Sequence, residues 1–305
     1  LRSANLDRFF KETAPAEIYT LPPPDALPIS AATPAPPSTS STALPPATAA
    51  PTQGSVVVPL ATRSPGGDHT TGTTPRSTQT EVTLRSANLD RTFKQYVPAA
   101  AGTAPAPLVI DLHGYLSGAS GQAAMSNLAA TADRAGFVLV TPQGNGPLPY
   151  WNAVPHGELP DDVKFVSDII DDVSGRLCID PRRVYVDGLS NGAFLTSLVA
   201  CRLADKVAAV AAVAGLLSPA DCAPARPIPI LAIHGTADQF VTYDGGPNVA
   251  LATLAWNPDS TKAFEGLAFA PVTETLATWA ARQGCTEPPE QQPVRGAVTR
   301  TSYHG

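Results

Sequence analysis

Residues 188–192 read GLSNG and place Ser190 between two glycines, in the pattern G-x-S-x-G. A serine on a tight turn between a strand and a helix can attack an acyl carbon, because the turn exposes its hydroxyl and the glycines relieve crowding. Three residues that favour β-structure, 184–186, precede the motif, and apolar residues at helical spacing follow it. We therefore predict that Ser190 is the nucleophile of an acyl-transfer reaction. The alternative is an ordinary serine at a glycine-flanked strand end.

Residues 111–115, DLHGY, end another apolar run and could supply a second part of this chemistry. Gly114 allows the backbone to approach a ligand closely. We predict that the backbone N–H of Tyr115 and that of Asn191, at the start of the helix after the serine, donate to the oxyanion of acyl transfer. We interpret His113 as a structural histidine that braces the loop, with a place in the substrate pocket as the alternative.

Asp238 lies in the segment IHGTAD, directly after a third apolar run and downstream of the serine. A carboxylate at this place would orient a histidine and stabilise its imidazolium, so Asp238 is the predicted acid of a triad. The alternative is a turn aspartate that accepts hydrogen bonds from its own backbone. Asp221 and Asp244 are weaker candidates, because neither directly follows a buried strand in this way.

A serine nucleophile needs a base that takes its proton, and five histidines are available. They are His69, His113, His156, His234 and His304. His69 lies in a linker, His156 in a loop rich in Pro and Gly, and His113 and His234 each precede a glycine at a strand end. Only His304 follows Asp238, and a base is hard to hold in place on a chain end. We therefore expect the catalytic histidine beyond residue 305, so that the sequence is truncated at its C-terminus and lacks its base.

These residues must be positioned by strands that alternate with helices. Apolar runs predict buried strands at 108–112, 137–141, 184–186, 207–213 and 228–233. Helical spacing predicts helices at 120–135, 163–178, 192–203 and 272–282. Alternating residues at 80–86 and 91–97 predict two antiparallel strands before them. The pattern is typical of an α/β fold with a mostly parallel sheet and helices on both faces.

The first 77 residues lack this periodicity. The string LRSANLDR occurs at 1–8 and again at 84–91, and residues 16–30 resemble a translated sequencing adapter. We interpret residues 1–30 as an assembly artefact. Residues 31–77 are rich in Ala, Pro, Thr, Ser and Gly and cannot bury enough apolar surface to fold, so we predict a disordered linker. The folded domain then spans 78–305.

Composition narrows the classes of partner. The net charge of -6 argues against nucleic acid, and no apolar run reaches the ~18 residues of a membrane span. The first residues lack the basic start and apolar core of a signal peptide, and the first residue is Leu1 instead of Met, so we expect the true N-terminus to be missing from this sequence. The four cysteines form no C-x-x-C pair, so we predict no metal site and leave open whether they are free thiols or disulfides of an exported enzyme. They are Cys178, Cys201, Cys222 and Cys285.

Several segments together resemble the poly(3-hydroxybutyrate) depolymerase-like esterases of the α/β-hydrolase fold, which include feruloyl and acetyl-xylan esterases. They are LVIDLHG, VTPQG with Tyr150-Trp151-Asn152, DDVKFVSDIIDDV, CIDPRRVYVDGLSNGA, AAVAAVAG and PIPILAIHGTADQFVTYDGG. The resemblance runs from about residue 84 to residue 305. It implies Ser190 as nucleophile, Asp238 as acid, no cofactor, and secretion from a bacterial cell. The implied substrate is a polyester, a feruloylated or acetylated polysaccharide, or a short-chain ester.

The same resemblance implies a histidine in a G-H-x-W-P-type segment, which this sequence does not reach. Trp151 lies in a polar loop after a strand and is a candidate for lining the substrate pocket, with a core aromatic as the alternative. Two other functions stay open. A peptidase on the same fold would cleave amides, and a non-catalytic scaffold would bind acyl or sugar ligands without turnover.

Overall fold

Strands and helices alternate along the chain, as the apolar runs predict. A computed structural model of the 305-residue chain describes residues 17–21, 76–101, 104–153, 159–247 and 268–304. The strands are β1 (Glu17–Leu21), β2 (Thr78–Ser86), β3 (Leu89–Val97), β4 (Ala106–Leu112), β5 (Val138–Pro142), β6 (Ile179–Leu189), β7 (Ala209–Val213), β8 (Ile230–Gly235), β9 (Gly246–Pro247), β10 (Ala268–Phe269), β11 (Glu290–Arg295) and β12 (Val298–Ser302). The helices are α2 (Gly118–Ser126), α3 (Leu128–Ala135), α4 (Asp162–Arg176), α5 (Asn191–Arg202) and α8 (Val272–Arg282).

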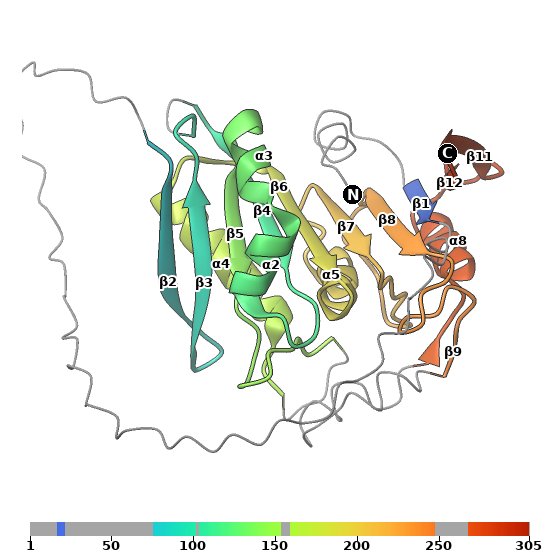
Figure 1. The fold of residues 1–305 in the computed structure, drawn as a ribbon, viewed down its shortest axis with the longest axis horizontal. Helices are drawn as coiled ribbons and strands as arrows, with labels where there is room; N and C mark the ends of the chain where they lie inside the picture. Colours follow the sequence, from blue (N-terminus) through green and yellow to red (C-terminus); the bar gives the residue numbers. More distant parts are fainter. Residues whose placement is uncertain (1–16, 22–75, 102–103, 154–158, 248–267, 305) are drawn as a thin grey trace, which may run out of the picture. The chain divides into compact units, whose positions relative to one another are not determined.

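Ten of the strands form one sheet in the order β11-β12-β1-β8-β7-β6-β4-β5-β3-β2 (Figure 1). Neighbouring strands from β5 through β4, β6, β7 and β8 are parallel. The pairs β2–β3, β3–β5 and β11–β12 are antiparallel. The sheet ends in β2 on one side and β11 on the other. The predicted α/β-hydrolase architecture, with a mostly parallel sheet, is confirmed.

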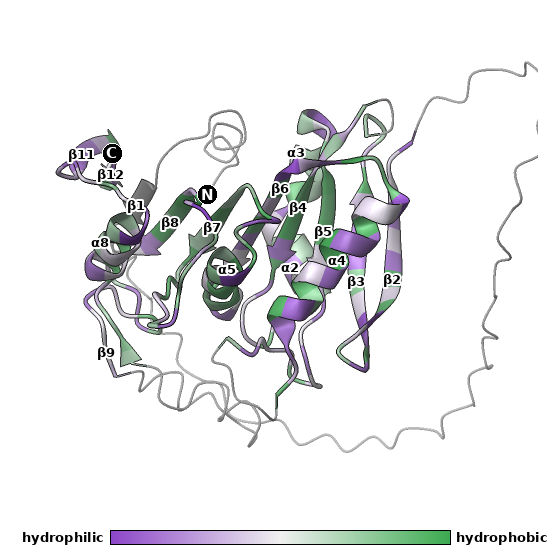
Figure 2. Ribbon diagram, turned by 180° about the vertical axis from the view of Figure 1, so that it is seen from behind, coloured by the Kyte–Doolittle hydropathy of each residue, from purple (hydrophilic) through white to green (hydrophobic). Residues whose placement is uncertain are grey.

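Helices cover both faces of the sheet. Side chains alternate along β4, so that Val109 packs with Leu128 and Phe137 on the side of α3. Ile110, its neighbour, packs instead into the larger core with Phe165 of α4. Figures 1 and 2, taken from opposite sides, show α2 and α3 in front of the sheet in one view and α4 in front in the other. The apolar colouring of the central strands in Figure 2 matches this double burial.

The predicted helix at 120–135 is wrong in one respect, because it is two helices. Asn127 has φ 50° and lies in the left-handed region, which ends α2 and starts α3. Asparagine tolerates this conformation better than most residues do. The prediction at 163–178 is confirmed as α4, whose N-cap Asp161 accepts a hydrogen bond from the backbone N–H of Lys164 at 2.9 Å.

The segment interpreted as an assembly artefact contributes one strand to the sheet. β1 pairs in parallel with β8 and antiparallel with β12. Strand pairing does not report the origin of a segment, so the interpretation of residues 1–30 stays a prediction. Most of the predicted linker, residues 31–75, lies outside the described residues.

Two of the four cysteines are joined. Cys201, in the last turn of α5, forms a disulfide with Cys222, whereas Cys178 and Cys285 are free. No helix among the described residues is long and apolar enough to cross a membrane. In the same part of the chain, no group of three or more His, Cys, Asp or Glu side chains could hold a metal ion.

Candidate active site

Ser190 lies on a strained turn between β6 and α5. Its φ is 52° and its ψ is -115°, a conformation that costs free energy for a residue with a Cβ. The turn is held on both sides, because the Ser190 N–H donates to the Val213 carbonyl at 2.8 Å and the Ser190 carbonyl accepts from the Phe194 N–H at 3.0 Å. The backbone therefore fixes the serine at the carboxyl edge of the parallel sheet.

The two glycines of the motif are required by close packing. A Cβ on Gly188 would lie 2.5 Å from the carbonyl carbon of Gly192. A Cβ on Gly192 would lie 2.4 Å from the Leu112 carbonyl oxygen, at the end of β4. No side chain fits at either position unless the backbone moves, so the turn after β6 is pressed directly against the end of β4.

The loop after β4 passes beside the nucleophile. A Cβ on Gly114 would lie 3.7 Å from the Cβ of Ser190. Tyr115 follows Gly114 in this loop, and Asn191 is the first residue of α5, where N–H groups have no partner within the helix. The two segments that carry the predicted oxyanion donors are thus adjacent at the serine.

His113 is neutral and structural in this arrangement. It is fully buried, its Nδ1 lies 2.7 Å from the Gly114 carbonyl oxygen, and its Nε2 accepts from the Gly144 N–H at 2.9 Å. Nδ1 therefore carries the proton, and burial lowers the pKa of the imidazole to about 4. With both ring nitrogens engaged, His113 cannot take a proton from Ser190.

Trp151 ties the loop after β5 to both of these segments. Its indole N–H donates to the His113 carbonyl oxygen at 2.8 Å. Its backbone N–H donates to Oδ1 of Asn191 at 2.6 Å, and its carbonyl accepts from Nδ2 of the same amide at 3.1 Å. Trp151 and His113 are both 0% exposed, which favours the core aromatic and the bracing histidine over the pocket-lining alternative for each.

Asp238 follows β8 and adopts the geometry of a turn aspartate. Its Oδ1 accepts from the N–H groups of Phe240 at 2.8 Å and Val241 at 3.0 Å. Its Oδ2 lies 3.6 Å from Nε2 of His234. The two backbone hydrogen bonds hold the carboxylate at the carboxyl edge of β8 and leave Oδ2 for a further donor. The competitor Asp221 instead pairs on the surface with an arginine at 3.7 Å and has a 78% exposed side chain.

Neither of the other described histidines is placed as a base for Ser190. His234 is buried, and its Nε2 donates to the Val241 carbonyl oxygen at 2.7 Å. His304 follows β12, which ends at Ser302. Ser302 lies opposite Glu17 of β1, and Glu17 lies opposite Leu231, near the start of β8. His304 therefore lies at the opposite edge of the sheet from the ends of β6 and β8, roughly 15–20 Å away along the strands. His69 and His156 lie outside the described residues.

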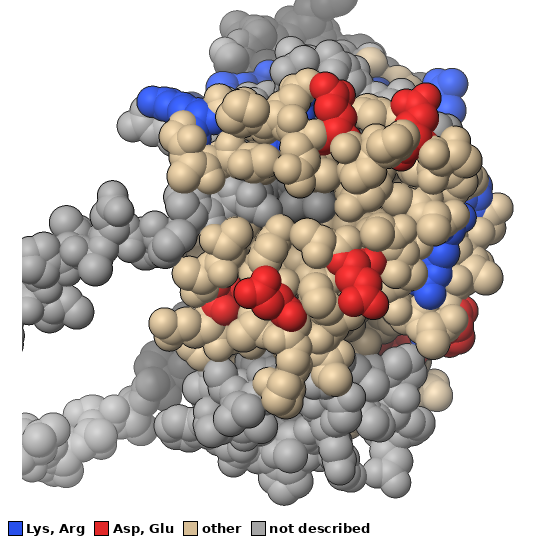
Figure 3. Space-filling model, turned by 90° about the vertical axis from the view of Figure 1, so that its right-hand side faces the viewer, with Lys and Arg blue, Asp and Glu red and all other residues tan. Residues whose placement is uncertain are grey.

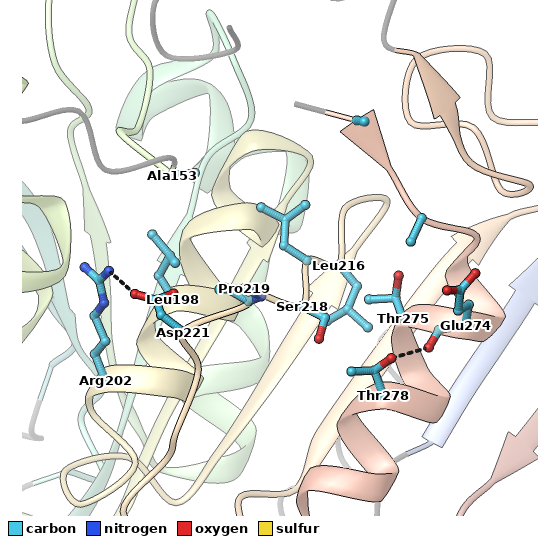
Figure 4. Close-up of a pocket in the computed structure, with 13 residues that line it drawn as sticks. Ala153, Leu198, Arg202, Leu216, Ser218, Pro219, Asp221, Glu274, Thr275 and Thr278 are labelled. Atoms are coloured by element: carbon cyan, nitrogen blue, oxygen red, sulfur yellow. Dashed lines mark hydrogen bonds and ion pairs between the residues drawn. The ribbon is translucent and has the colours of Figure 1, made fainter. Parts of the chain in front are cut away.

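A cavity of about 620 Å³ lies between α5, the segment after β7, and α8 (Figure 4). Leu198 and Arg202 of α5 form one wall, Leu216 of the segment forms the floor, and Glu274 and Thr278 of α8 form the other wall. Ser190, Asp238 and the predicted oxyanion donors do not line it, whereas the weaker candidate Asp221 does. Figure 3, which faces the side of the molecule that carries α8, shows acidic side chains in the middle and upper part of the view and basic ones along its top and right margins.

The sequence patterns did not reveal a second buried group next to the turn. Asp111 of β4 and Asp187 of β6 are register partners in adjacent parallel strands. Asp111 is fully buried and accepts from Nε2 of Gln122 at 2.5 Å and from Oγ of Ser126 at 2.7 Å. The Oδ1 of Asp187 is buried without a hydrogen-bond partner among the described residues. Burial raises the pKa of Asp111 to about 6, and burial together with the Asp111 carboxylate raises the pKa of Asp187 well above its usual range.

Comparison with known proteins gives a consistent picture. The family described as "Esterase PHB depolymerase" matches residues 91–225. Feruloyl esterase B of Piromyces equi is 32% identical over 197 residues, which cover 62% of this chain and 35% of that protein. Poly(3-hydroxyalkanoate) depolymerase C of Paucimonas lemoignei is 34% identical over 135 residues, which cover 42% of this chain and 32% of that protein. The chain thus spans about a third of the length of these two relatives.

A solved structure described as a thermostable esterase is similar to 61% of this chain and 59% of its own, with 18% identity and a TM-score of 0.48.

Proposed function

We propose, from the match of residues 91–225 to the esterase PHB depolymerase family, that the chain is the core of a serine esterase that hydrolyses carboxylic esters. The observation that carries the proposal is the strained turn at Ser190, with φ 52°, packed against Gly114. A hydroxyl displayed in this way suits attack on an acyl carbon.

In the proposed mechanism, Oγ of Ser190 forms a bond to the carbonyl carbon of the ester while its proton passes to a base. The negative charge that develops on the carbonyl oxygen is stabilised by the N–H groups of Tyr115 and Asn191 and by the N-terminal end of α5. The bond to the alcohol then breaks, and the base returns the proton to the leaving oxygen. Water repeats the sequence on the acyl-enzyme and releases the acid.

The acid of this proposal is Asp238. Its Oδ1 is fixed by two backbone N–H groups, which leaves Oδ2 to accept from the histidine that acts as base. His113 has both ring nitrogens hydrogen-bonded, His234 is buried with its Nε2 bound to the Val241 carbonyl, and His304 lies at the far end of the strands. We therefore assign the base to a histidine outside the described residues.

The substrate proposed here is an ester of the kinds that the relatives are named for, a feruloyl ester or a poly(3-hydroxyalkanoate). The disulfide between Cys201 and Cys222 supports a site of action outside the reducing cytosol, because such bonds persist mainly in oxidising compartments.

The test is hydrolysis of a short-chain p-nitrophenyl ester by the purified chain, by its Ser190→Ala variant, and by both in a form extended past Gly305. The proposal expects turnover that depends on Ser190 in at least one of the two lengths. Turnover by the chain of 305 residues would mean that His69 or His156 acts as base. No serine-dependent hydrolysis by either length would overturn the proposal.

One observation favours a second candidate. None of the described histidines is placed to take the proton of Ser190. A non-catalytic scaffold that binds acyl or sugar ligands needs no such base. The scaffold predicts that a soluble ester binds to the extended form without being cleaved. The same assay therefore separates the two functions.

A further inference from the structure

The oxyanion donors of the proposed esterase sit on two segments that are far apart in the sequence, at Tyr115 and Asn191. For both N–H groups to reach one oxygen, the spacing between the loop after β4 and the start of α5 must be fixed to within a fraction of an ångström. The side chain of Tyr115 is half-buried and packs against an apolar cluster that includes Phe194 of α5. A third element adds directed hydrogen bonds between the two segments.

We propose that Trp151 is this element, a positioning residue that sets the spacing of the oxyanion donors through a buried ring of hydrogen bonds. The inference rests on the proposed function. From the side of α5, the Asn191 amide binds both the N–H and the carbonyl of Trp151, at 2.6 and 3.1 Å. From the side of the loop, the Trp151 indole N–H binds the His113 carbonyl, at 2.8 Å. One residue thus bridges the two segments directly.

The histidine completes the ring. His113 donates from Nδ1 to the Gly114 carbonyl and accepts at Nε2 from the N–H of Gly144, in the same loop that carries Trp151. Its ring also packs against the indole, with centroids 4.7 Å apart. The hydrogen bond from Gly144 to His113 requires a glycine at position 144, because a Cβ there would lie 2.7 Å from Nε2 of His113.

The ring is buried and its side-chain polar groups are hydrogen-bonded, which gives it stiffness. Trp151 and His113 are 0% exposed and Asn191 is 1% exposed. In such surroundings a missing hydrogen bond is not replaced by water, so each bond constrains the geometry more than a surface bond does. Loss of the indole N–H should let the loop at His113 move relative to Asn191, although the apolar packing of a large ring is kept.

The chain contains a matched control for this substitution. Trp279 of α8 is also 0% exposed, and its indole N–H also donates to a backbone carbonyl at 2.8 Å, that of Leu217. Trp151→Phe and Trp279→Phe therefore remove the same kind of group from the same kind of site. Both should lower the melting temperature, but only the first touches segments that carry the oxyanion donors.

The experiment measures the equilibrium affinity of the purified chain for phenylboronic acid. Boron bonds to Oγ of Ser190, the serine proton goes to the buffer, and the tetrahedral anion that results places an oxygen where the oxyanion would be. Adduct formation is measured both in the chain of 305 residues and in the form extended past Gly305, because a protonated base beside Oγ stabilises the anion. We expect Trp151→Phe to weaken binding by about 10- to 100-fold, the range for a displacement of up to 1 Å, and Trp279→Phe to leave it within about twofold.

A second variant guards against misfolding of the first. Asn191→Ala keeps its own backbone N–H but loses both bonds to Trp151, so it should weaken the boronate to a similar degree. In the double variant the loss should be smaller than the product of the two, because both act on one ring. Equal affinities for Trp151→Phe and Trp279→Phe, or fully multiplicative losses, would overturn the inference.

Ester hydrolysis separates this inference from the proposed function. A wild-type chain that binds the boronate at Ser190 but hydrolyses no ester in any length would refute the function and leave the positioning role standing. In a form that turns over, Trp151→Phe should lower kcat with little change in KM, since the ring acts on the oxyanion and not on the ground-state ester. Absence of boronate binding in the extended form as well would refute both.

Discussion

Replacing Asp111 with Asn should remove a loss of stability that the folded chain suffers as the pH rises. Asp111 lies beside Asp187 on neighbouring strands, and its buried carboxyl is bound by Gln122 and Ser126 of α2. An asparagine has nearly the same shape but does not ionise. Gln122, whose Oε1 is buried without a partner, can turn its amide to accept from the new side chain.

The magnitude follows from the raised pKa. The pKa of Asp111 is about 6 in the folded chain, against an ordinary value of 3.8 that applies after unfolding. Between these two values the folded state holds a proton that the unfolded state releases, so the free energy of unfolding falls as the pH rises. Below pH 4 the cost is absent, and above pH 6 it is complete. A difference of about 2 pKa units corresponds to about 3 kcal/mol.

The assay is urea denaturation followed by tryptophan fluorescence at pH 4, 5, 6 and 7, for wild type and Asp111→Asn. The constant cost of altered hydrogen bonds cancels when the difference between the two proteins is compared across pH. That difference should shift by about 3 kcal/mol in favour of the variant from pH 4 to pH 7. Asp90→Asn, at an exposed carboxylate, controls for the change in net charge. If the two proteins keep a constant difference in stability from pH 4 to pH 7, the argument from the buried pair is refuted.

Two further predictions concern the frame of the site. Arg91→Met should lower the free energy of unfolding, measured in urea at pH 7, by about 3–5 kcal/mol, because it leaves the buried carboxylate of Asp162, 2.8 Å away, without its cation. Lys164→Met, at an exposed ion pair, should cost less than about 1 kcal/mol. An equally small loss for Arg91→Met would contradict the prediction. Ser190→Gly should be inactive, yet more stable than Ser190→Ala by about 1 kcal/mol, because glycine adopts a positive φ without the strain that a Cβ causes. Equal thermal midpoints of the two variants would show that the turn is not strained.

The elements that local patterns specify could be predicted from the sequence. The turn at Ser190 has a signature within five residues, because a Cβ on Gly188 would clash with Gly192 inside the motif itself. Helix α4 has an apolar stripe with a clear period, and it begins and ends close to the predicted positions. The break at Asn127 was missed, since a single residue in the left-handed region does not disturb the helical spacing on either side.

Features that join distant segments could not be predicted in this way. The role of Trp151 depends on bonds to residues about forty positions away, at Asn191 and His113, and no periodicity in the sequence records them. The pairing of β1 with β8 is of the same kind, because it joins segments that lie far apart in the chain. The buried partner of Asp111 was likewise hidden, since Asp187 lies on a strand whose register becomes known only when the sheet is assembled.

The two ends of the sheet bear on how copies of this protein behave at high concentration. An open sheet exposes a row of unpaired N–H and C=O groups at each edge, which can recruit a strand from another molecule. Here β2 presents exposed charged side chains, Glu81 and Arg85, and the exposed strand β11 contains Pro293, which has no N–H to offer, next to a shift in register. An incoming strand would have to bury charges at one edge and find a gap in the ladder at the other. The folded protein should therefore resist growth into fibres by strand addition, and any stable assembly of copies would have to form through the helical faces or the loops.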